Sequence, residues 1–383
     1  MALNFDPNTL QTPCYVVDEA LLIKNLETLK AIADRTNCKI LLAQKAFSMY
    51  SLYPLIGKYL HGTAASGLYE ALLAYEEMGK EVHIHSPVYR PDDFDRILDI
   101  CDVIVFNSFE QWQKYREKAM QAKRKRPNLR FGIRINPEFS TQPNPLWDPC
   151  ASGSRLGTTL ANFRPDLLEG ISGLHFHALC EQNSDALATT LKVVEDKFGS
   201  YLQDMQWINF GGGHYITKAD YDVETLVSCI TDFQERYDIE VYLEPGEAIA
   251  LDAGFLVASV LDIAENGERV NVFLDASAAC HIPEILSFRY RVDVLNAGLA
   301  NEKRHTYTLV APTCLSGDIF GDYSFDEPLE INDKIVFTDS ATYTMVKNNT
   351  FNGVGLPSIV IARADGEVEV VKRFGYDDFK SRL

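Results

Sequence analysis

Short apolar runs alternate with amphipathic segments over the first two-thirds of the chain. Clusters of β-branched residues bounded by turn residues predict eight strands, at 38–45, 62–66, 81–86, 103–107, 130–136, 171–178, 207–211 and 240–244. Helical spacing fills the segments between them, and 19–34 carries one apolar stripe behind Asp18 as helix cap, formed by Leu22, Leu26, Leu29 and Ile32. Another helix is expected from Ser108, with Gln111 completing a capping box. Repeated strand and helix units over about 230 residues predict an α/β fold, a TIM (β/α)8 barrel.

From about residue 255 the pattern changes to alternating strands. The runs LVASVLDIAE, VNVFLDAS, HTYTLVAP and DKIVFTDS each fit a strand, and SIVIARADGEVEVVKRF fits a hairpin that turns at Asp365-Gly366. We therefore expect a barrel domain over 18–255 and a β domain over 256–383. The N-terminal strand within 1–17 precedes the first barrel helix, and we expect it to cross over and join the β domain.

Composition and charge narrow the class of protein. The 383 residues are 46% hydrophobic and 23% charged, as in ordinary globular proteins, and the eight cysteines include no CxxC pair that would indicate a zinc ribbon. The start of the chain lacks the layout of a secretory signal, and no long apolar run is present, so a cytoplasmic location is expected. The net charge of -18 disfavours nucleic acid or an anionic membrane as partner and favours a cationic substrate.

Because barrel active sites lie where strands end, the polar residues at those positions are the candidates for chemistry. Lys45 follows the apolar run KILLAQ, where partial desolvation would lower the pKa of its amine and allow an imine with an aldehyde. A lysine that merely extends its stem along a strand end is the structural alternative.

His175-Phe176-His177 ends the sixth strand, and a period of two points both imidazoles to one face. The HxH pattern also fits a metal site, which would need further ligands at other strand ends; packing or hydrogen bonding is the other alternative.

The seventh strand leads into Gly211-Gly212-Gly213, where a barrel often binds phosphate through backbone amides; a plain turn is the alternative. Glu244 ends the eighth strand and would aim a carboxylate into the barrel mouth, unless it is a surface acid. A lysine, a histidine, a glycine triplet and a glutamate on four strands could together hold a phosphorylated aldehyde.

Taken in order, the sequence motifs of this chain resemble those of the fold type III pyridoxal-phosphate-dependent decarboxylases, the group that includes ornithine and diaminopimelate decarboxylases. The resemblance covers nearly the whole chain. Within the family it is most similar to the carboxynorspermidine (carboxyspermidine) decarboxylase branch, through LLAQKAF, SGSRLG, HFHALCE, NFGGGH, EPGEA, HIPE, TCLSGD and TYTMVKNNTFNG. It implies an alanine racemase-like architecture, in which a TIM barrel is followed by a β-sandwich or β-barrel domain.

The resemblance also implies a role for each residue of the site. Lys45 would be the Schiff-base lysine, His177 the histidine that stacks on the cofactor ring, and Glu244 the partner of the pyridine nitrogen. Gly212 and Gly213 would cradle the phosphate of pyridoxal 5'-phosphate. Tyr343 would help to hold that phosphate, and Cys314 would be a catalytic thiol contributed by a partner subunit, so the resemblance implies a homodimer with active sites shared across the interface.

Glu244 favours decarboxylation, because a carboxylate keeps the pyridine nitrogen protonated and the ring able to accept an electron pair. Glu247 stands where diaminopimelate and ornithine decarboxylases carry arginine, which favours a substrate with a distal amine, a cationic polyamine such as carboxynorspermidine or carboxyspermidine. Further substrate contacts are expected from Asp275, His281, Glu284 and Asp318.

Three other functions compete with this reading of the sequence. The first is decarboxylation of another diamino acid, such as diaminopimelate, and the second is an inactive regulatory homologue. The third is a metal-dependent barrel hydrolase built on His175 and His177.

Overall fold

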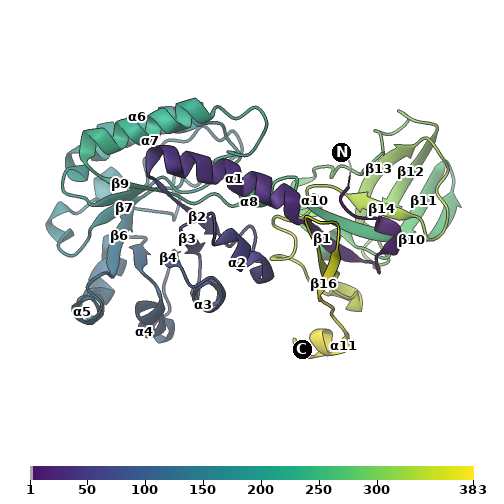
Figure 1. Ribbon diagram of the computed structural model, residues 1–383, viewed down its shortest axis with the longest axis horizontal. Coiled ribbons are helices and arrows are strands. Elements are labelled where there is room, and N and C mark those ends of the chain that lie inside the picture. The colour runs from purple at the N-terminus through teal and green to yellow at the C-terminus, as the bar shows by residue number, and fades with distance from the viewer. Residues whose placement is uncertain (1–2) are drawn as a thin grey trace. The chain divides into compact units, whose positions relative to one another are not determined.

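The computed structural model describes residues 3–383, and the first two residues of the expected 1–17 strand segment lie outside this range. The chain divides into two compact units. One comprises the chain through Lys24 together with Ala250–Leu383, and the other is Asn25–Ile249. Figure 1 shows the strands and helices of both units.

Eight parallel strands form a closed barrel in the unit Asn25–Ile249. All eight predicted strands are present, and the barrel closes where Lys39 and Ile40 of the first pair with Tyr242 and Leu243 of the last. The strands are β2 (Lys39–Ala43), β3 (Gly62–Ala65), β4 (Glu81–His85), β5 (Val103–Phe106), β6 (Arg130–Arg134), β7 (Gly173–His175), β8 (Trp207–Asn209) and β9 (Glu240–Leu243). The predicted TIM barrel is therefore confirmed.

Helices alternate with these strands along the chain and surround the barrel (Figure 1). They are α1 (Glu19–Thr36), α2 (Tyr53–Ile56), α3 (Leu68–Glu77), α4 (Pro91–Ile100), α5 (Phe109–Lys125), α6 (Ser184–Leu202), α7 (Val223–Tyr237) and α8 (Glu247–Ala250), with short 3-10 helices at Tyr50–Leu52, Leu160–Asn162 and Pro165–Leu167. Ser108 caps α5 by accepting a hydrogen bond from the backbone of Gln111, as predicted. The Gln111 side chain, however, accepts from Asn107 N instead of closing the box on Ser108.

Side chains fill the barrel interior in layers, as expected for a packed core. The middle layer centres on the fully buried Trp207, whose ring lies where Gly132 and Gly173 have no side chain. Leu41 and Val103 belong to the same apolar cluster. This layer separates two polar ends of the barrel.

The other unit is an eight-stranded sheet, in the order β13-β12-β11-β10-β1-β15-β16, with β14 paired to β10. The strands are β1 (Cys14–Asp18), β10 (Gly254–Asn266), β11 (Arg269–Leu274), β12 (His305–Val310), β13 (Ile319–Phe325), β14 (Lys334–Phe337), β15 (Ser358–Ala362) and β16 (Val368–Lys372). The remaining helices are α9 (Ala278–His281), α10 (Glu284–Phe288) and α11 (Tyr376–Lys380), with 3-10 turns at Pro7–Thr9 and Phe351–Gly353. Fully buried β1 lies between β10, antiparallel, and β15, parallel.

One strand of this sheet was not predicted. β13 reads IFGDYSF, and its internal Gly321 and Asp322 hide the alternation that identifies a strand. It forms because β12 supplies a long antiparallel partner, with Tyr307 opposite Tyr323. Tertiary pairing has overridden a weak local signal.

No helix in residues 3–383 has the length and apolar character that crossing a membrane requires.

Candidate active site

Polar side chains gather at the carboxyl ends of the barrel strands. Each comes from the last residue of a strand or from the loop directly behind it, and they are Lys45 after β2, His85 on β4, Arg134 on β6, His175 on β7, Asn209 on β8 and Glu244 after β9. Because all strands of a parallel barrel end at the same rim, six separate segments contribute to one site. The expected location of the active site in the barrel is thus occupied by titratable groups.

Lys45 has a solvent-accessible side chain. Even so, the pKa of its amine is lowered, chiefly because the surrounding protein removes water from it and secondly because of the Arg134 charge. The carboxylates of Glu244 and Glu247 oppose this shift. A lowered pKa gives a larger share of neutral, nucleophilic amine at neutral pH, which is what attack on an aldehyde requires.

Two donors from neighbouring strands hold the Glu244 carboxylate. The amide of Asn209 donates to Oε1 at 2.7 Å, and Nε2 of His175 lies 3.3 Å from Oε2. Burial disfavours the charged carboxylate, but the hydrogen bonds from His175 and Asn209 outweigh it and hold the pKa of Glu244 below its usual value. The pKa of His175 is itself lowered by burial, so we regard its hydrogen bond, rather than a full positive charge, as the stabilising contact.

His177 lies two residues beyond His175, and its Nδ1 accepts a hydrogen bond from the backbone of Gly212 at 2.8 Å. Burial, then the charges of Lys45 and Arg134, lower the pKa of His177 well below its usual value. The imidazole is therefore neutral at neutral pH, with Nδ1 fixed as its acceptor.

The glycine triplet stands where three loops meet, and this explains its composition. A Cβ at Gly211 would lie 2.4 Å from Phe176 O, one at Gly212 would lie 2.3 Å from Glu244 O, and one at Gly213 would lie 2.0 Å from Leu179 O. Gly211 and Gly213 also have positive φ angles of 72° and 83°. The triplet is more than a turn, since the loops after β7, β8 and β9 approach one another only without side chains there.

The two imidazoles of the HxH pattern do not converge on one point. Nδ1 of His177 binds the Gly212 amide, whereas Nε2 of His175 faces Glu244. Within residues 3–383, no three histidine, cysteine or acidic side chains are grouped as metal ligands. The structure thus assigns both histidines hydrogen-bonding partners of their own.

His85 and Arg134 were not predicted as site residues. The His85 ring stacks on His175 with centroids 5.4 Å apart and planes 18° from parallel, and Arg134 Nη1 lies 3.5 Å from His85 Nδ1. Arg134 also donates to the His177 carbonyl at 3.3 Å, and burial lowers the pKa of its guanidinium to about 10, which leaves it charged at neutral pH. Their signal was available, because both are polar residues close to the ends of the predicted strands 81–86 and 130–136.

In the sheet unit, Asp318 orders the loop that carries Cys314. Its carboxylate accepts hydrogen bonds from Ser277 Oγ at 2.6 Å, Ala279 N at 2.9 Å and Thr313 Oγ1 at 2.6 Å, and it is buried. The Cys314 side chain is exposed, and its backbone amide donates to Asn352 Oδ1 at 2.8 Å. Asp318 therefore has a full set of structural partners, and its direct contact with substrate stays a prediction.

Asp275 and His281 are also occupied within the sheet unit. Asp275 accepts from Thr12 Oγ1 at 2.6 Å and from Ser259 N at 2.8 Å. His281 is fully buried, accepts from Ser277 N at 3.1 Å and places Nε2 3.1 Å from Gly355 O, while burial lowers its pKa to about 4. These contacts fit structural roles, so substrate contacts by both residues likewise stay predictions.

Glu284 begins α10 and forms an ion pair with Lys347. The Lys347 ammonium also lies 4.9 Å from the centroid of the Tyr343 ring. Tyr343 adopts a positive φ of 51°, uncommon for a residue with a side chain, within the segment that Asn349 ties to α9 through Ala279 O and Cys280 O. One lysine therefore links an expected substrate ligand to an expected phosphate ligand.

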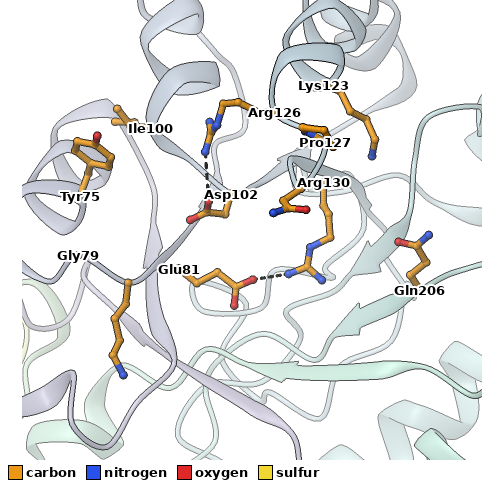
Figure 2. Close-up of a pocket in the computed structure, with 12 residues that line it drawn as sticks. Tyr75, Gly79, Glu81, Ile100, Asp102, Lys123, Arg126, Pro127, Arg130 and Gln206 are labelled. Atoms are coloured by element: carbon orange, nitrogen blue, oxygen red, sulfur yellow. Dashed lines mark hydrogen bonds and ion pairs between the residues drawn. The ribbon is translucent and has the colours of Figure 1, made fainter.

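The opposite, amino-terminal end of the barrel holds a cavity of about 950 Å³ (Figure 2). Arg130 binds Glu81 and Glu240 there, and Arg126 binds Asp102 at 3.3 Å and the carbonyl of Cys101. These pairs neutralise the two arginines that line the cavity. Residues at this face of a TIM barrel typically serve stability.

A family model described as "Pyridoxal-dependent decarboxylase, C-terminal sheet domain" matches residues 14–341, which span the barrel as well as much of the sheet unit. The chain belongs to this family. The match supports decarboxylation. It gives no support to the two other functions considered from the sequence, an inactive regulatory homologue and a metal-dependent hydrolase.

The curated relatives of this enzyme are also decarboxylases. A carboxynorspermidine/carboxyspermidine decarboxylase of Campylobacter jejuni is 43% identical over 97% of this chain and 98% of its own. A carboxyaminopropylagmatine decarboxylase of Synechocystis is 41% identical over 98% of this chain and 96% of its own. The crystal structure of carboxynorspermidine decarboxylase complexed with norspermidine from Campylobacter jejuni superposes with a TM-score of 0.91 at 41% identity and covers 98% of this chain and 100% of its own.

The comparison structures also confirm the two-part architecture of this decarboxylase. A diaminopimelate decarboxylase with 18% identity matches with a TM-score of 0.82 over 98% of this chain, which shows a shared fold. The resemblance inferred from the ordered motifs is thus confirmed for the family and for its carboxynorspermidine/carboxyspermidine decarboxylase branch.

Proposed function

We propose that this enzyme uses pyridoxal phosphate to decarboxylate a carboxylated polyamine, carboxynorspermidine or carboxyspermidine. The observation that carries the proposal is the Glu244 carboxylate, held anionic by Asn209 and His175 at the rim of the barrel that also carries the low-pKa amine of Lys45. The relatives from Campylobacter jejuni and Synechocystis support a polyamine-like substrate.

The residues at the barrel rim fit the cofactor. A pyridoxal ring needs an amine for its aldehyde, an anion for its pyridine nitrogen and donors for its phosphate. Lys45 offers the amine and Glu244 the anion. The loop through Gly211, Gly212 and Gly213 offers the phosphate backbone without side chains, and in this structure the amides of Gly211 and Gly212 donate to Asn209 Oδ1 and His177 Nδ1.

Bound there, pyridoxal phosphate supplies an electron sink for the pair released when the bond between Cα and the carboxylate breaks. Glu244 holds a proton at the pyridine nitrogen, because an ionised carboxylate only accepts. Neutral His177 presents its ring face without a competing charge, since its Nδ1 is occupied by Gly212. Lys45 binds the cofactor and orients it.

We place the remaining functional groups in the sheet unit. Cys314 is exposed on a loop that Asp318 and Asn352 order, which suits a thiol that delivers a proton to Cα after carbon dioxide leaves. Tyr343 is proposed to bind the cofactor phosphate. In the homodimer that we propose, Cys314 acts in the active site of the partner subunit.

We assign the selection of substrate to acidic side chains of the protein. Glu247 begins α8, three residues beyond Glu244, and its charge acts on Lys45 at the barrel rim. A long substrate with several ammonium groups needs more than one acid, and Glu284 is the second choice because its ion pair with Lys347 can exchange one ammonium for another. Asp275, His281 and Asp318 are proposed as further substrate contacts, with their present hydrogen bonds made inside the sheet unit.

A second candidate substrate is a carboxylated aminopropylagmatine, because the Synechocystis relative is nearly as similar as the one from Campylobacter jejuni. A guanidinium in place of a terminal ammonium would also be attracted by Glu247. Diaminopimelate fits less well, since its distal carboxylate would be repelled by that glutamate.

The test of function is carbon dioxide release from purified enzyme supplied with each of these four substrates in turn. We expect the carboxylated triamines to react fastest and diaminopimelate to be inert. Glu247→Arg should lower kcat/KM for the triamines by about 10- to 100-fold, because one well-placed charged hydrogen bond contributes about 1.5–3 kcal/mol.

Glu247→Gln, which keeps the shape and loses the charge, is the control and should fall between the two. Equal kcat/KM in all three proteins would rule out the selectivity role of Glu247. Preference for diaminopimelate would overturn the proposed substrate class.

A further inference from the structure

His175 ends β7 inside the ring of site residues, and so far only its hydrogen bond to Glu244 has entered the proposed function. It is almost fully buried, with 2% of its surface exposed. Its contacts run in two directions, to the Glu244 carboxylate through Nε2 and to the stacked ring of His85.

The hydrogen bonds around Glu244 fix the orientation of its carboxylate. Asn209 accepts from Gly211 N through Oδ1 at 2.8 Å, so its other end must be the amide that donates to Glu244 Oε1. His175 contributes the second donor, to Oε2. Each oxygen thus has one donor from the protein, and each keeps an acceptor position for a further partner.

The same contacts determine the state of the His175 ring. Ionised Glu244 cannot donate, so Nε2 must carry the hydrogen, and in the neutral ring Nδ1 is then an acceptor. That atom is buried and has no hydrogen-bond partner among the described residues. A proton on Nδ1 would create a buried cation with no acceptor, close to the Arg134 guanidinium that already lies against His85.

From this geometry we propose that His175 is a positioning residue for Glu244. As a neutral Nε2–H donor it locks the carboxylate in place without neutralising it, so that the full negative charge is available to the pyridine nitrogen of the cofactor. His85 and Arg134 act behind it, by packing against the ring and by disfavouring its protonation. The proposal rests on the function proposed above and names one further residue that the reaction needs.

A charged histidine would serve worse in this position. An imidazolium beside Glu244 would form an ion pair and compete with the pyridinium for the same charge, whereas a neutral donor adds direction alone. An apolar side chain would leave Oε2 with one fewer donor in a buried site, which raises the free energy of the ionised form. Either change would weaken the hold of the pyridine nitrogen on its proton.

The experiment compares His175→Leu, which removes the donor, with His175→Gln, which restores a side-chain amide. His61→Gln is the matched control, because His61 lies before β3 at the amino-terminal end of the barrel and accepts from Ile40 N. Each protein is loaded with pyridoxal phosphate labelled with ¹⁵N in its ring, and the ring-nitrogen chemical shift, cofactor affinity, kcat and KM are measured.

In wild type and His61→Gln we expect the shift of a protonated pyridine nitrogen. In His175→Leu it should move toward the unprotonated value and kcat should fall by about 10- to 100-fold with KM little changed, the usual cost of losing a residue that orients a reacting group. His175→Gln should recover most of both. A merely structural histidine would leave the ring-nitrogen shift unchanged.

The proposal is overturned if His175→Leu keeps the protonated shift and the wild-type kcat. If that variant does not fold, His175→Ser is used in its place with the same two outcomes. Wild-type protein that fails to bind the labelled cofactor would instead contradict the function proposed above, so the two failures are distinguishable.

Discussion

Gly212→Ala tests the close approach of the loops that build the cofactor cradle. The added methyl would lie 2.3 Å from the backbone oxygen of Glu244 and 3.3 Å from Cε1 of His177. An ordinary van der Waals contact lies at 3.4–4 Å, so the two loops would have to separate by about 1 Å. The displaced groups are the proposed ring-nitrogen partner and the histidine that Gly212 N holds at 2.8 Å.

Two effects of opposite sign set the magnitude. Overpacking a rigid backbone contact costs about 1–3 kcal/mol. Alanine also restricts the unfolded chain, which stabilises the folded state by about 0.4–1 kcal/mol. Steric cost should win, so we expect a loss of about 1–2 kcal/mol in the free energy of unfolding. Misplacement of reacting groups by about 1 Å should lower kcat/KM by up to about 100-fold.

The assay is urea unfolding together with carbon dioxide release. Gly375→Ala is the matched control, because a Cβ at the start of α11 meets nothing within 4 Å. We expect the control to keep wild-type activity and to be as stable as wild type or more stable, by up to about 1 kcal/mol. Equal stability and activity of Gly212→Ala and Gly375→Ala would refute the inference that the triplet is dictated by close packing.

Two more predictions concern the barrel. The pKa of Glu244 is lowered in the folded state, so its stabilising contribution is complete above its unfolded pKa of about 4.3 and is lost as the pH falls through the folded value. Wild type should therefore lose about 1 kcal/mol more unfolding free energy than Glu244→Gln between about pH 6 and pH 3.5. Parallel losses in the two proteins would contradict the shift. Gly173→Ala would place a methyl 2.0 Å from the Trp207 ring and should lower the free energy of unfolding by about 1–3 kcal/mol, measured by thermal unfolding. The same substitution in a Trp207→Leu background should cost much less. Equal costs in both backgrounds would rule out the ring as the cause.

The barrel strands were predictable because each is a short apolar run followed by a turn, and buried parallel strands need little else. The sites of Lys45 and Glu244 followed from the same pattern, since both stand directly behind such a run. β13 was missed because Gly321 and Asp322 interrupt its alternation, and only the pairing with β12 makes it a strand.

The sequence alone could not predict the roles of residues whose hydrogen-bond partners lie far away along the chain. Asp275 and Asp318 look like available acids in the printed chain, but Thr12 and Ser277 occupy them in the fold. Arg134 could have been found by applying the strand-end rule to every strand, yet its contact with His85 joins residues 49 positions apart. Local patterns specify elements; they do not specify which hydrogen bonds the elements bring together.

The most direct test of the central claim is to identify the residue that carries the cofactor. Protein purified with pyridoxal phosphate is reduced with borohydride, digested and analysed by mass spectrometry, with Lys45→Ala in parallel. We predict a phosphopyridoxyl group on Lys45 in the wild type and loss of both the label and the visible absorption of the bound cofactor in the variant. Label on a different lysine, or undiminished absorption in Lys45→Ala, would contradict the account.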